Sequence, residues 1–400
     1  MTSKTKVRNN IFGTVLTDVG PSSNYRGDSE GGNFTPLQKL QYPDGIHTVF
    51  SGESIRNRLR DMLRGPAFPS NRSRLSNQGQ LAVKFKTYPN PLEYADDKLF
   101  GFLALYKGSE RKSVVKSLES ARKPKDKAKG KVDYEKIREL EAQLKELDAY
   151  AGFQGDSVLR INYAVSLNPF DDDSTMHQSP MMFVSSKEKS VQSSAIFHRE
   201  VHVTAYQYPF GLNLNDLRAP EDLNLSDEDL RALEDLSLTD ERRKELESKR
   251  KELESRRKGL ESNYRKWTAT LLRGVSELNC VGGNHARTMF SHAPVSIVLR
   301  LTTRRTPDFD LYGFKDNQRE LLEAFEDELP TKDGEKKYRL PGEEFYIGGK
   351  FAREHEKLKD LLKRSKTNSP ANNLEKINLF RTPLEAIEAV IEDAGLSKES

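Results

Sequence analysis

Apolar residues in the first part of the chain follow strand spacing and then helix spacing. Residues 11–19 are rich in β-branched and aromatic side chains and predict a strand, which ends at the polar, glycine-rich stretch 20–33. Residues 51–64 then repeat apolar side chains at helical spacing behind Ser51, a candidate N-cap. We therefore expect a strand and then an amphipathic helix. The apolar face of this helix consists of Ile55, Leu59, Met62 and Leu63.

Three later segments have strand character: 158–167, 195–208 and 295–301. The polar segment 168–194 joins the first two and predicts an extended hairpin. Exposed apolar side chains at the tip of such a hairpin are costly unless they contact a partner. They would either wedge between bases or anchor the hairpin on its own domain. These side chains are Met181, Met182 and Phe183.

Helical spacing returns in several charged segments. Residues 133–150 carry a narrow apolar seam, and 264–278 predict a second amphipathic helix before the last strand. Residues 221–267 form a charged helical insertion with a seven-residue repeat, whose single apolar residue per repeat is too little for an autonomous coiled coil. After Pro307 we expect mostly charged helix. The repeat places Leu246, Leu253, Leu260 and Trp267 seven residues apart.

The predicted elements occur in the order strand, helix, insertion, strand, hairpin, strand, insertion, helix, strand. This is a βαββαβ scheme with large insertions, which predicts an α+β protein. The expected fold is ferredoxin-like, the layout of RNA-recognition-motif domains.

Composition and charge narrow the picture. Apolar residues make up 35% of the 400 residues and charged residues 32%, so the core is modest for the length of the chain. The net charge is only +4 at a sequence pI near 8.8, and basic and acidic blocks are separated along the chain. No apolar run approaches the ~20 residues needed to cross a bilayer, so we expect a soluble, cytoplasmic protein without a membrane partner.

A single cysteine, Cys280, excludes an intramolecular disulfide and a cysteine-based zinc site, and we expect it to be buried. His198 and His202 lie four apart in a predicted strand and hence on one face. Without a third ligand we interpret them as surface or groove residues, so no metal or cofactor is expected.

Two segments carry chemistry suited to phosphates. The helix at 51–64 has Arg56, Arg58, Arg60 and Arg64 opposite its apolar face, where they either contact phosphates or are simply solvated. Residues 282–287 read Gly-Gly-Asn-His-Ala-Arg between a helix and a strand. Glycines allow close backbone approach to a ligand, although the pair is equally consistent with a helix C-cap and a tight turn.

Several motifs together resemble a known family. They are Ile11-Phe-Gly-Thr-Val-Leu-Thr, Gly31-Gly-Asn-Phe, Ser51-Gly-Glu-Ser-Ile-Arg-Asn-Arg-Leu-Arg, Glu200-Val-His-Val-Thr-Ala-Tyr-Gln-Tyr-Pro-Phe and Val281-Gly-Gly-Asn-His-Ala-Arg. In this order they resemble the backbone subunit of the type I CRISPR surveillance complex Cascade, the Cas seven family in its DevR-like autoregulator branch. The repeat insertion and the region after Pro307 lie outside the resemblance.

The resemblance implies a hand-shaped protein that binds CRISPR guide RNA. Further copies of the chain would line up along one guide with other Cascade subunits and hold it open for pairing with target DNA. The implied division is palm 1–64, 156–167, 195–220 and 265–305, finger insertion 65–155, thumb hairpin 168–194, charged helical insertion 221–264 and C-terminal helical region 306–400.

The resemblance also carries roles onto individual residues. It implies guide-backbone contacts for Asn33, Arg56, Arg58, Arg60, Gly282, Gly283, Asn284, His285 and Arg287, and a thumb wedge made by Met181, Met182 and Phe183. Arg56 and Arg60 share a helix face, whereas Arg58 points elsewhere. Asn33 could instead support its own glycine turn, and His285 could cap the preceding helix.

Two rival functions remain at this stage. Related type III backbone subunits cleave target RNA with a loop aspartate in the presence of metal, and this chain has Asp18, Asp28 and Asp44 in the corresponding region. No second carboxylate or histidine is arranged with them in the sequence, so we expect no catalytic residue and no enzyme. A regulatory protein that uses its charged helix for partner contacts is the third class.

Overall fold

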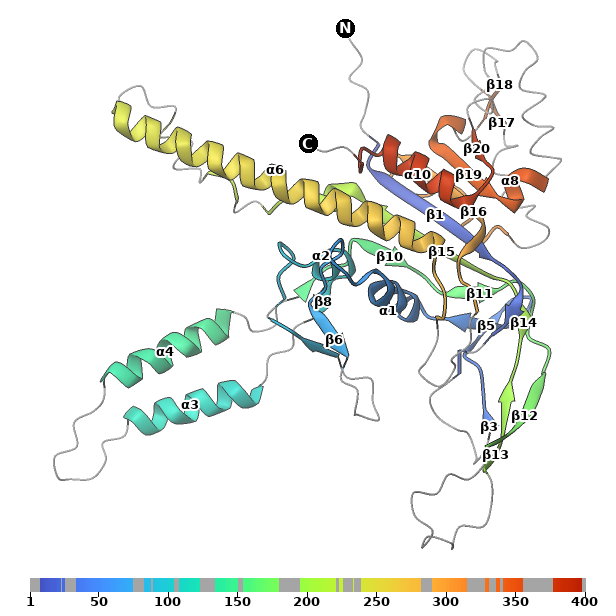
Figure 1. Ribbon diagram of the computed structural model, residues 1–400, viewed down its shortest axis with the longest axis horizontal. Helices are drawn as coiled ribbons and strands as arrows, with labels where there is room; N and C mark the ends of the chain where they lie inside the picture. The colour runs from blue at the N-terminus through green and yellow to red at the C-terminus, as the bar shows by residue number, and fades with distance from the viewer. Residues whose placement is uncertain are drawn as a thin grey trace, which may run out of the picture. The chain divides into compact units, whose positions relative to one another are not determined.

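The computed structural model (Figure 1) shows an α+β chain, as expected from the sequence. Contacts divide it into two compact units, Met1–Phe68 with Val158–Ser400, and Pro69–Ser157. The structure describes residues 8–22, 24–25, 34–74, 83–87, 89–103, 108–122, 134–149, 154–179, 195–220, 223–225, 233, 239–281, 290–314, 328–330, 336–338, 341–354 and 377–397. The bounds of the second unit, Pro69–Ser157, are within four residues of those of the suggested finger insertion, 65–155.

The centre of the first unit is an antiparallel sheet around β1 (Asn10–Thr17). Its neighbours are β15 (Tyr206–Asn213) and β16 (Pro294–Thr302), and β15 also pairs with β10 (Leu159–Ile161) and β11 (Ala164–Ser166). The strand order is therefore β16-β1-β15-β11. With α1 after β1 and α6 before β16, the elements follow the strand–helix–strand–strand–helix–strand order of the sequence scheme.

The sheet continues beyond this centre on both sides. On one side β11 pairs with β5 (Gly45–Phe50), which pairs with β4 (Lys39–Tyr42). On the other side β16 pairs with β19 (Phe345–Gly349), which pairs in parallel with β20 (Asn378–Phe380). The region after Pro307 was expected to be mostly helical, and this was wrong for the two strands that extend the sheet. Their short apolar runs follow no period long enough to distinguish strand from helix.

Two predicted strands are divided in the structure. Residues 158–167 form β10 and β11, because Asn162 turns its side chain to accept the backbone N–H of Tyr163 at 2.8 Å. Residues 195–208 were expected to form one strand but form β13 (Ala195–Glu200), β14 (Val203–Thr204) and the start of β15. β13 pairs with β12 (Ser174–Ser179), β14 with β2 (Gly20–Pro21) and β15 with β1. The alternation of side chains along a strand does not indicate which strand it will pair with.

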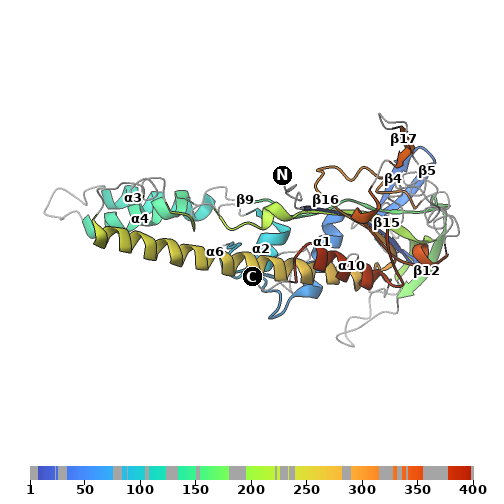
Figure 2. The same cartoon turned by 90° about the horizontal axis from the view of Figure 1, so that it is seen from above.

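Three helices pack together against one side of the sheet (Figures 1 and 2). They are α1 (Gly52–Leu63), α6 (Asp240–Ser276) and α10 (Pro383–Asp393). α6 contacts both others, and α10 contacts β16 and β19. α1 lies close to α6 because Gly274 has no Cβ, and a Cβ there would lie 2.8 Å from Leu63 Cδ2.

α6 is one continuous helix of 37 residues, whereas the sequence predicted an insertion followed by a second helix. Of the repeat residues, Leu246 and Trp267 are buried, and Leu253 and Leu260 are half-buried. Residues 214–220 and 223–225 help to cover this seam, since Glu261 accepts from the backbone N–H of Ala219 at 3.2 Å and Leu217, Leu223 and Leu225 are buried. The seam therefore rests on the chain's own residues.

The opposite side of the sheet is covered by residues 307–314, which we call the covering segment. Thr14 of β1 donates to the carbonyl of Leu311 at 2.7 Å, and Gln207 of β15 accepts from the N–H of Phe314 at 3.1 Å. Tyr312 donates to the carbonyl of Tyr163 at 2.9 Å. Beneath these contacts is a buried cluster of Leu16, Ala205, Val298, Phe309, Phe314, Phe345, Ile347, Phe351, Ala352 and Ile377.

The remaining described elements are short or belong to the second unit. In the first unit they are β2 (Gly20–Pro21), β3 (Phe34–Thr35), β12 (Ser174–Ser179), β17 (Glu328–Pro330), β18 (Lys336–Tyr338), α8 (Lys350–Glu354), and the 3-10 helices η1 (Leu214–Leu217) and η3 (Gly342–Glu344). In the second they are β6 (Arg72–Arg74), β7 (Val83–Phe85), α2 (Ala95–Phe100), β8 (Phe102–Leu103), α3 (Gly108–Arg122), α4 (Tyr134–Ala149) and β9 (Gln154–Gly155). The predicted helix at 133–150 is confirmed as α4, and it packs on α3, which the sequence reasoning missed.

β12 and β13 form an antiparallel hairpin with β3 alongside β13, in a sheet separate from the main one. The hairpin predicted at 168–194 is thus present, but it includes β13, which we had assigned to a palm strand. No helix in the described ranges has both the length and the apolar character needed to cross a membrane.

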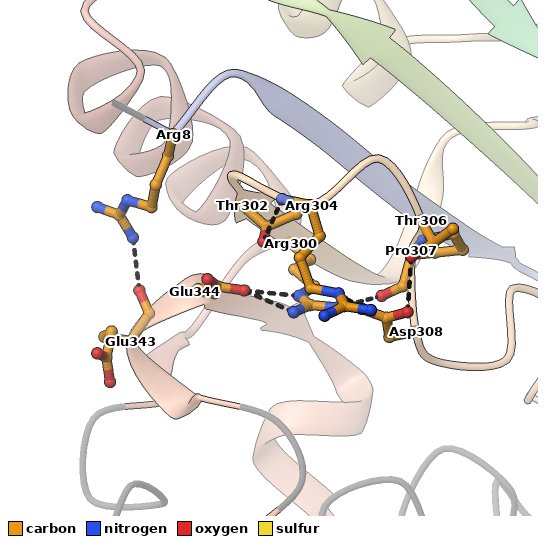
Figure 3. Close-up of polar contacts among 9 residues, drawn as sticks. All are labelled: Arg8, Arg300, Thr302, Arg304, Thr306, Pro307, Asp308, Glu343 and Glu344. Atoms are coloured by element: carbon orange, nitrogen blue, oxygen red, sulfur yellow. Dashed lines mark hydrogen bonds and ion pairs between the residues drawn. The ribbon is translucent and has the colours of Figure 1, made fainter. Parts of the chain in front are cut away.

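A buried arginine fixes the covering segment to the sheet (Figure 3). The side chain of Arg300 on β16 is 1% exposed and donates through Nε to Glu344 at 2.8 Å. It also bonds Asp308 at 3.1 Å and the carbonyl of Pro307. An uncompensated buried charge is costly, so Arg300 requires both carboxylates in place. It thereby joins β16, the covering segment and the start of β19.

We expect Arg300→Met to lower the free energy of unfolding by about 3 to 5 kcal/mol, because Glu344 and Asp308 lose their buried cation and Asp308 keeps, among the described residues, only the exposed Arg304 as an ion-pair partner. Arg304 is the matched control: its side chain is 64% exposed and pairs with the same Asp308. Arg304→Ala should cost no more than about 1 kcal/mol, as exposed pairs do. Urea unfolding of both variants measures the difference, and equal losses would contradict this role of Arg300.

Candidate nucleic-acid interface

The predicted arginine helix is confirmed as α1, and the structure shows what holds it. Ser51 is the N-cap and accepts from the N–H of Ser54 at 3.2 Å. Ile55 and Leu59 are fully buried, as the apolar spacing predicted. Gly52 permits close approach to β10, since a Cβ there would lie 2.4 Å from the carbonyl oxygen of Ile161. α1 is therefore fixed at its first turn and along its apolar face.

The arginines of α1 differ in exposure. Arg60 is only 7% exposed, while Arg56 and Arg58 are half-buried. Arg64 is exposed and lies 3.4 Å from Asp61. The face is therefore not the freely solvated one that charged residues on a short helix usually form. Arg56 and Arg58 present more surface to a ligand than Arg60 does.

Arg58 ties α1 to the chain just before the predicted glycine loop. Its Nε donates to the carbonyl of Asn279 at 2.8 Å, and its Nη2 donates to Oδ1 of the same residue at 2.8 Å. A fork with two parallel donors fixes its partner's orientation as well as its position. The side chain that the sequence reasoning set apart from Arg56 and Arg60 thus connects the two predicted binding segments.

The two ends of the loop are held together at its base. Asn279 and Ser291 form an isolated antiparallel bridge, the N–H of Cys280 donates to the carbonyl of Phe290 at 3.0 Å, and the N–H of His292 donates to that of Leu278 at 2.8 Å. Residues 282–289 lie between these ends and outside the described residues. The base of the glycine loop is consequently placed beside α1.

Aromatic side chains make a second anchor, after the loop. His292 is fully buried, with its ring 4.5 Å from that of Phe50 and 4.7 Å from that of Phe290 between ring centroids. Tyr208 donates to the carbonyl of His292 at 3.0 Å. Burial lowers the pKa of His292 to about 3, so the ring is neutral. Phe50 directly precedes the N-cap of α1, so this cluster also joins the loop to the helix.

Several predicted site residues lie outside the described part of the chain. They are Asn33, Gly282, Gly283, Asn284, His285, Arg287, Met181, Met182 and Phe183. Their roles remain predictions. The described part of the hairpin does expose two apolar side chains, Met176 at 69% and Ile196 at 44%. The register pairs Met176 with His198 and Gln178 with Ile196, so both apolar side chains lie on one face.

Two expectations about single residues were wrong. Cys280 is exposed, with a backbone φ of 51°, because it lies where the chain turns out of α6 toward the loop. His198 and His202 do not share a strand face: His198 is exposed on β13, whereas His202 lies beyond the strand and is buried. Burial and the nearby His47 lower the pKa of His202. No set of three potential metal ligands comes together among the described residues.

The candidate aspartates have ordinary partners where they are described. Asp18 is exposed and accepts from the N–H of Val19 at 2.9 Å. Asp44 does have a histidine beside it, contrary to the sequence reading, with Oδ1 3.2 Å from Nε2 of His47. Nδ1 of His47 lies 2.7 Å from the carbonyl oxygen of Ser166, and the Ser166 hydroxyl donates to the carbonyl of Asn168 at 2.8 Å. Asp28 lies outside the described residues.

Sequence reasoning missed Asn279, Phe50 and His292 as parts of the interface. Asn279 follows the predicted helix 264–278 and looks like its end. Phe50 and His292 contact each other in the fold, but no residue near either one in the sequence indicates this contact. The only signal for Asn279 in the sequence is its place shortly before Gly282 and Gly283. Nothing in the sequence connects it with Arg58, which is 221 positions away.

Comparison with known proteins gives a relative that matches most of the chain, although no family model matches it. Over 349 residues the chain is 27% identical to the CRISPR-associated protein Cas7/Cst2/DevR of Myxococcus xanthus (strain DK1622), covering 85% of this chain and 86% of that protein. The chain is a homologue of this Cas7/Cst2/DevR protein. The resemblance found in the sequence motifs is thereby confirmed.

Two solved structures are also similar to this Cas7/Cst2/DevR homologue, at a low level. One is a chain of a CRISPR RNA-guided surveillance complex, pre-nicking, with a TM-score of 0.42 and 11% identity over 96% of this chain and 100% of that one. The other is a chain of a CRISPR RNA-guided surveillance complex, with a TM-score of 0.35 and 10% identity over 96% and 99%. These likenesses are too weak to extend the argument from sequence.

Arg58→Ala should lower the free energy of unfolding by about 1.5 to 3 kcal/mol, the usual cost of losing hydrogen bonds to a charged group. Asn279→Ala removes the bond from Arg58 Nη2 and the bond that Asn279 Nδ2 donates to the carbonyl of Glu277, while the bond from Arg58 Nε to the backbone stays. Since Arg58→Ala also removes the shared Nη2 bond, the double variant should cost less than the two single losses added together. Arg64→Ala, which removes an exposed arginine from the same helix, should cost about 1 kcal/mol at most. Fully additive losses for Arg58 and Asn279 would contradict the clamp.

His292 should make the protein lose stability in acid. Its pKa is lowered from 6.5 to about 3 in the fold, so below pH 6.5 the unfolded chain binds a proton that the folded chain does not. The free energy of unfolding should then fall by up to about 1.4 kcal/mol per pH unit between these values. His292→Phe should flatten this dependence in urea titrations at pH 7 and pH 4.5. His198→Asn, at an exposed histidine, should leave it unchanged, and equal slopes for all three proteins would exclude the effect.

Proposed function

We propose that this Cas7/Cst2/DevR homologue is a non-catalytic backbone subunit of a type I Cascade surveillance complex. It binds CRISPR guide RNA, lines up with further copies of itself and other Cascade subunits along the guide, and presents the guide for pairing with target DNA. One observation carries the proposal: Arg58 and the aromatic cluster fix the base of the 282–289 loop beside the arginine helix α1. The sequence relationship supports it.

The chemistry of the interface suits a backbone ligand. A guide must be gripped through its phosphates without regard to sequence, because sequence is read by base pairing. The half-buried Arg56 lies on α1, and the adjoining loop contains two glycines, an asparagine, a histidine and an arginine. Guanidinium groups and closely approaching backbone N–H groups are donors for phosphate.

The covering segment restricts where the RNA can lie. In many RNA-recognition-motif domains, bases stack on the open face of the sheet. Here the hydrogen bonds from Thr14 to Leu311 and from Phe314 to Gln207 hold the chain's own residues over that face. The proposal therefore places the guide at α1 and the loop.

Contact between copies is assigned to the hairpin. Met176 and Ile196 lie on one exposed face of β12 and β13, and water-exposed apolar side chains on such a face favour burial against a partner. We propose that this face, together with the predicted wedge at Met181, Met182 and Phe183, contacts the RNA held by the neighbouring copy.

A metal-dependent ribonuclease is the alternative function, and Asp44 beside His47 is the observation that favours it. Against it, the fully buried His47 bonds a backbone carbonyl and cannot reach solvent from that position. The Ser166 hydroxyl is likewise occupied. The pair is better suited to holding the turn before β5 than to activating water.

RNA binding tests the proposal. Arg56→Ala should weaken binding of the purified chain to unrelated guide RNAs by a similar factor and should lower the slope of log affinity against log salt by about 1. Lys251→Ala removes a charge from an exposed position on α6 and should change neither quantity. Bound RNA should also slow alkylation of Cys280, which is exposed and is the only cysteine.

Loss of affinity that depends on guide sequence, or an unchanged salt slope for Arg56→Ala, would contradict the proposed interface. The same samples incubated with magnesium should keep the bound RNA and an added complementary target RNA intact. Target cleavage that disappears in Asp44→Asn or Asp18→Asn would instead establish the ribonuclease alternative.

A further inference from the structure

Glu200 occupies the joint between the hairpin and the rest of the first unit. It is the last residue of β13 and pairs in register with Ser174, the first residue of β12. Apart from β3, the hairpin sheet has no strand partner in the described chain. Its direction is therefore decided where β12 and β13 meet the body. Figure 1 shows both strands leading away from the main sheet at this point.

The carboxylate of Glu200 is buried and fully engaged. Its Oε2 accepts from the backbone N–H of Leu37 at 2.7 Å, and its Oε1 accepts from Nζ of Lys39 at 2.6 Å. Its side chain is only 9% exposed. Two short charge-assisted bonds to different atoms leave a carboxylate one orientation.

One donor, Lys39, belongs to the edge strand of the main sheet, and the other, Leu37, lies two residues before that strand. Lys39 is the first residue of β4, and its Nζ lies 4.2 Å from the centre of the Phe170 ring, just before β12. Lys39 thus contacts the entry and the exit of the hairpin at once. Beyond Glu200 the strand stops, and the N–H of Val201 donates to the carbonyl of Asp173 at 3.0 Å.

We infer that Glu200 is a positioning residue that sets the direction of the β12–β13 hairpin, by clamping the end of β13 to Leu37 and Lys39 at the sheet edge. The functional consequence rests on the proposed function. In a row of identical subunits, every hairpin must reach the neighbouring copy at the same angle. A loosened joint would leave binding by one subunit intact and weaken assembly of several.

The direct test needs no RNA. Spin labels on the native Cys280, which is exposed, and on Gln178→Cys in β12 report the distance between hairpin and body in the purified full chain. Glu200→Gln keeps an oxygen for Leu37 but loses the ion pair, and Glu200→Ala loses both. The distance distribution should broaden in Glu200→Gln and broaden further in Glu200→Ala. Glu254→Gln, which breaks an exposed pair with Arg250, should leave it as narrow as in the parent.

Lower stability alone could also broaden the distribution, so a second variant separates the two effects. The double variant Glu200→Gln, Lys39→Met removes both charges and leaves no unpaired ion. It should melt close to the parent temperature, followed by circular dichroism, and still show the broad distribution. A distribution as narrow as the parent's in both Glu200→Gln and the double variant overturns the inference.

Assembly on RNA gives the functional readout. On an RNA long enough for one copy, the Glu200 variants should bind with the same affinity as the parent chain. On an RNA long enough for several copies, they should reach full occupancy only at a several-fold higher protein concentration. Equal assembly despite a broad distance distribution would contradict the functional consequence. If the parent chain binds no RNA at all, the proposed function fails, while the distance measurement still decides the role of Glu200.

Discussion

Burial of β1 on both faces is the constraint that organises this protein. Nearly every residue of the strand is buried, and Gly13 is packed so closely that a Cβ would lie 2.5 Å from the Phe210 ring. A strand covered on both sides requires two layers of cover, and α1, α6 and α10 supply one of them. The covering segment supplies the other together with Phe351 and Ala352 of α8, and the buried Arg300 keeps the covering segment there. Over β1 and β15, the sheet face opposite α1, α6 and α10 is therefore occupied by the chain's own residues.

The candidate interface lies instead at α1 and the base of the 282–289 loop. Polar clamps act there together with apolar and aromatic packing. Arg58 fixes Asn279 beside α1, and Glu200 fixes the hairpin beside β4. Both clamps use the geometry of a charged, forked group with two partners. Such groups hold an angle, whereas apolar contacts mainly hold a distance. The proposed function, in which copies repeat along a guide, would require both the RNA contacts of each copy and the direction of its hairpin to be fixed.

The histidines show how burial separates residues of one type. His292 is enclosed by aromatic rings, which keeps it neutral and makes it part of the core. His198, on an exposed strand of the hairpin, has no such enclosure. Spacing alone had placed His198 and His202 on one face. They are separated because β13 ends at Glu200, and His202 lies beyond it, just before β14, which pairs with β2 in another sheet.

The sequence by itself determined the elements whose pattern is local: β1, α1 with its Ser51 cap, α4 and β16. It also determined the family resemblance, which rests on short contiguous motifs. Only the tertiary structure decided which strands pair, that residues 240–276 form one helix, that the region after Pro307 extends the main sheet, and that Cys280 is exposed. The physical reason is sequence separation. Caps and apolar periods act within a few residues, whereas partners such as Arg58 and Asn279, or Lys39 and Glu200, meet only after the chain has folded.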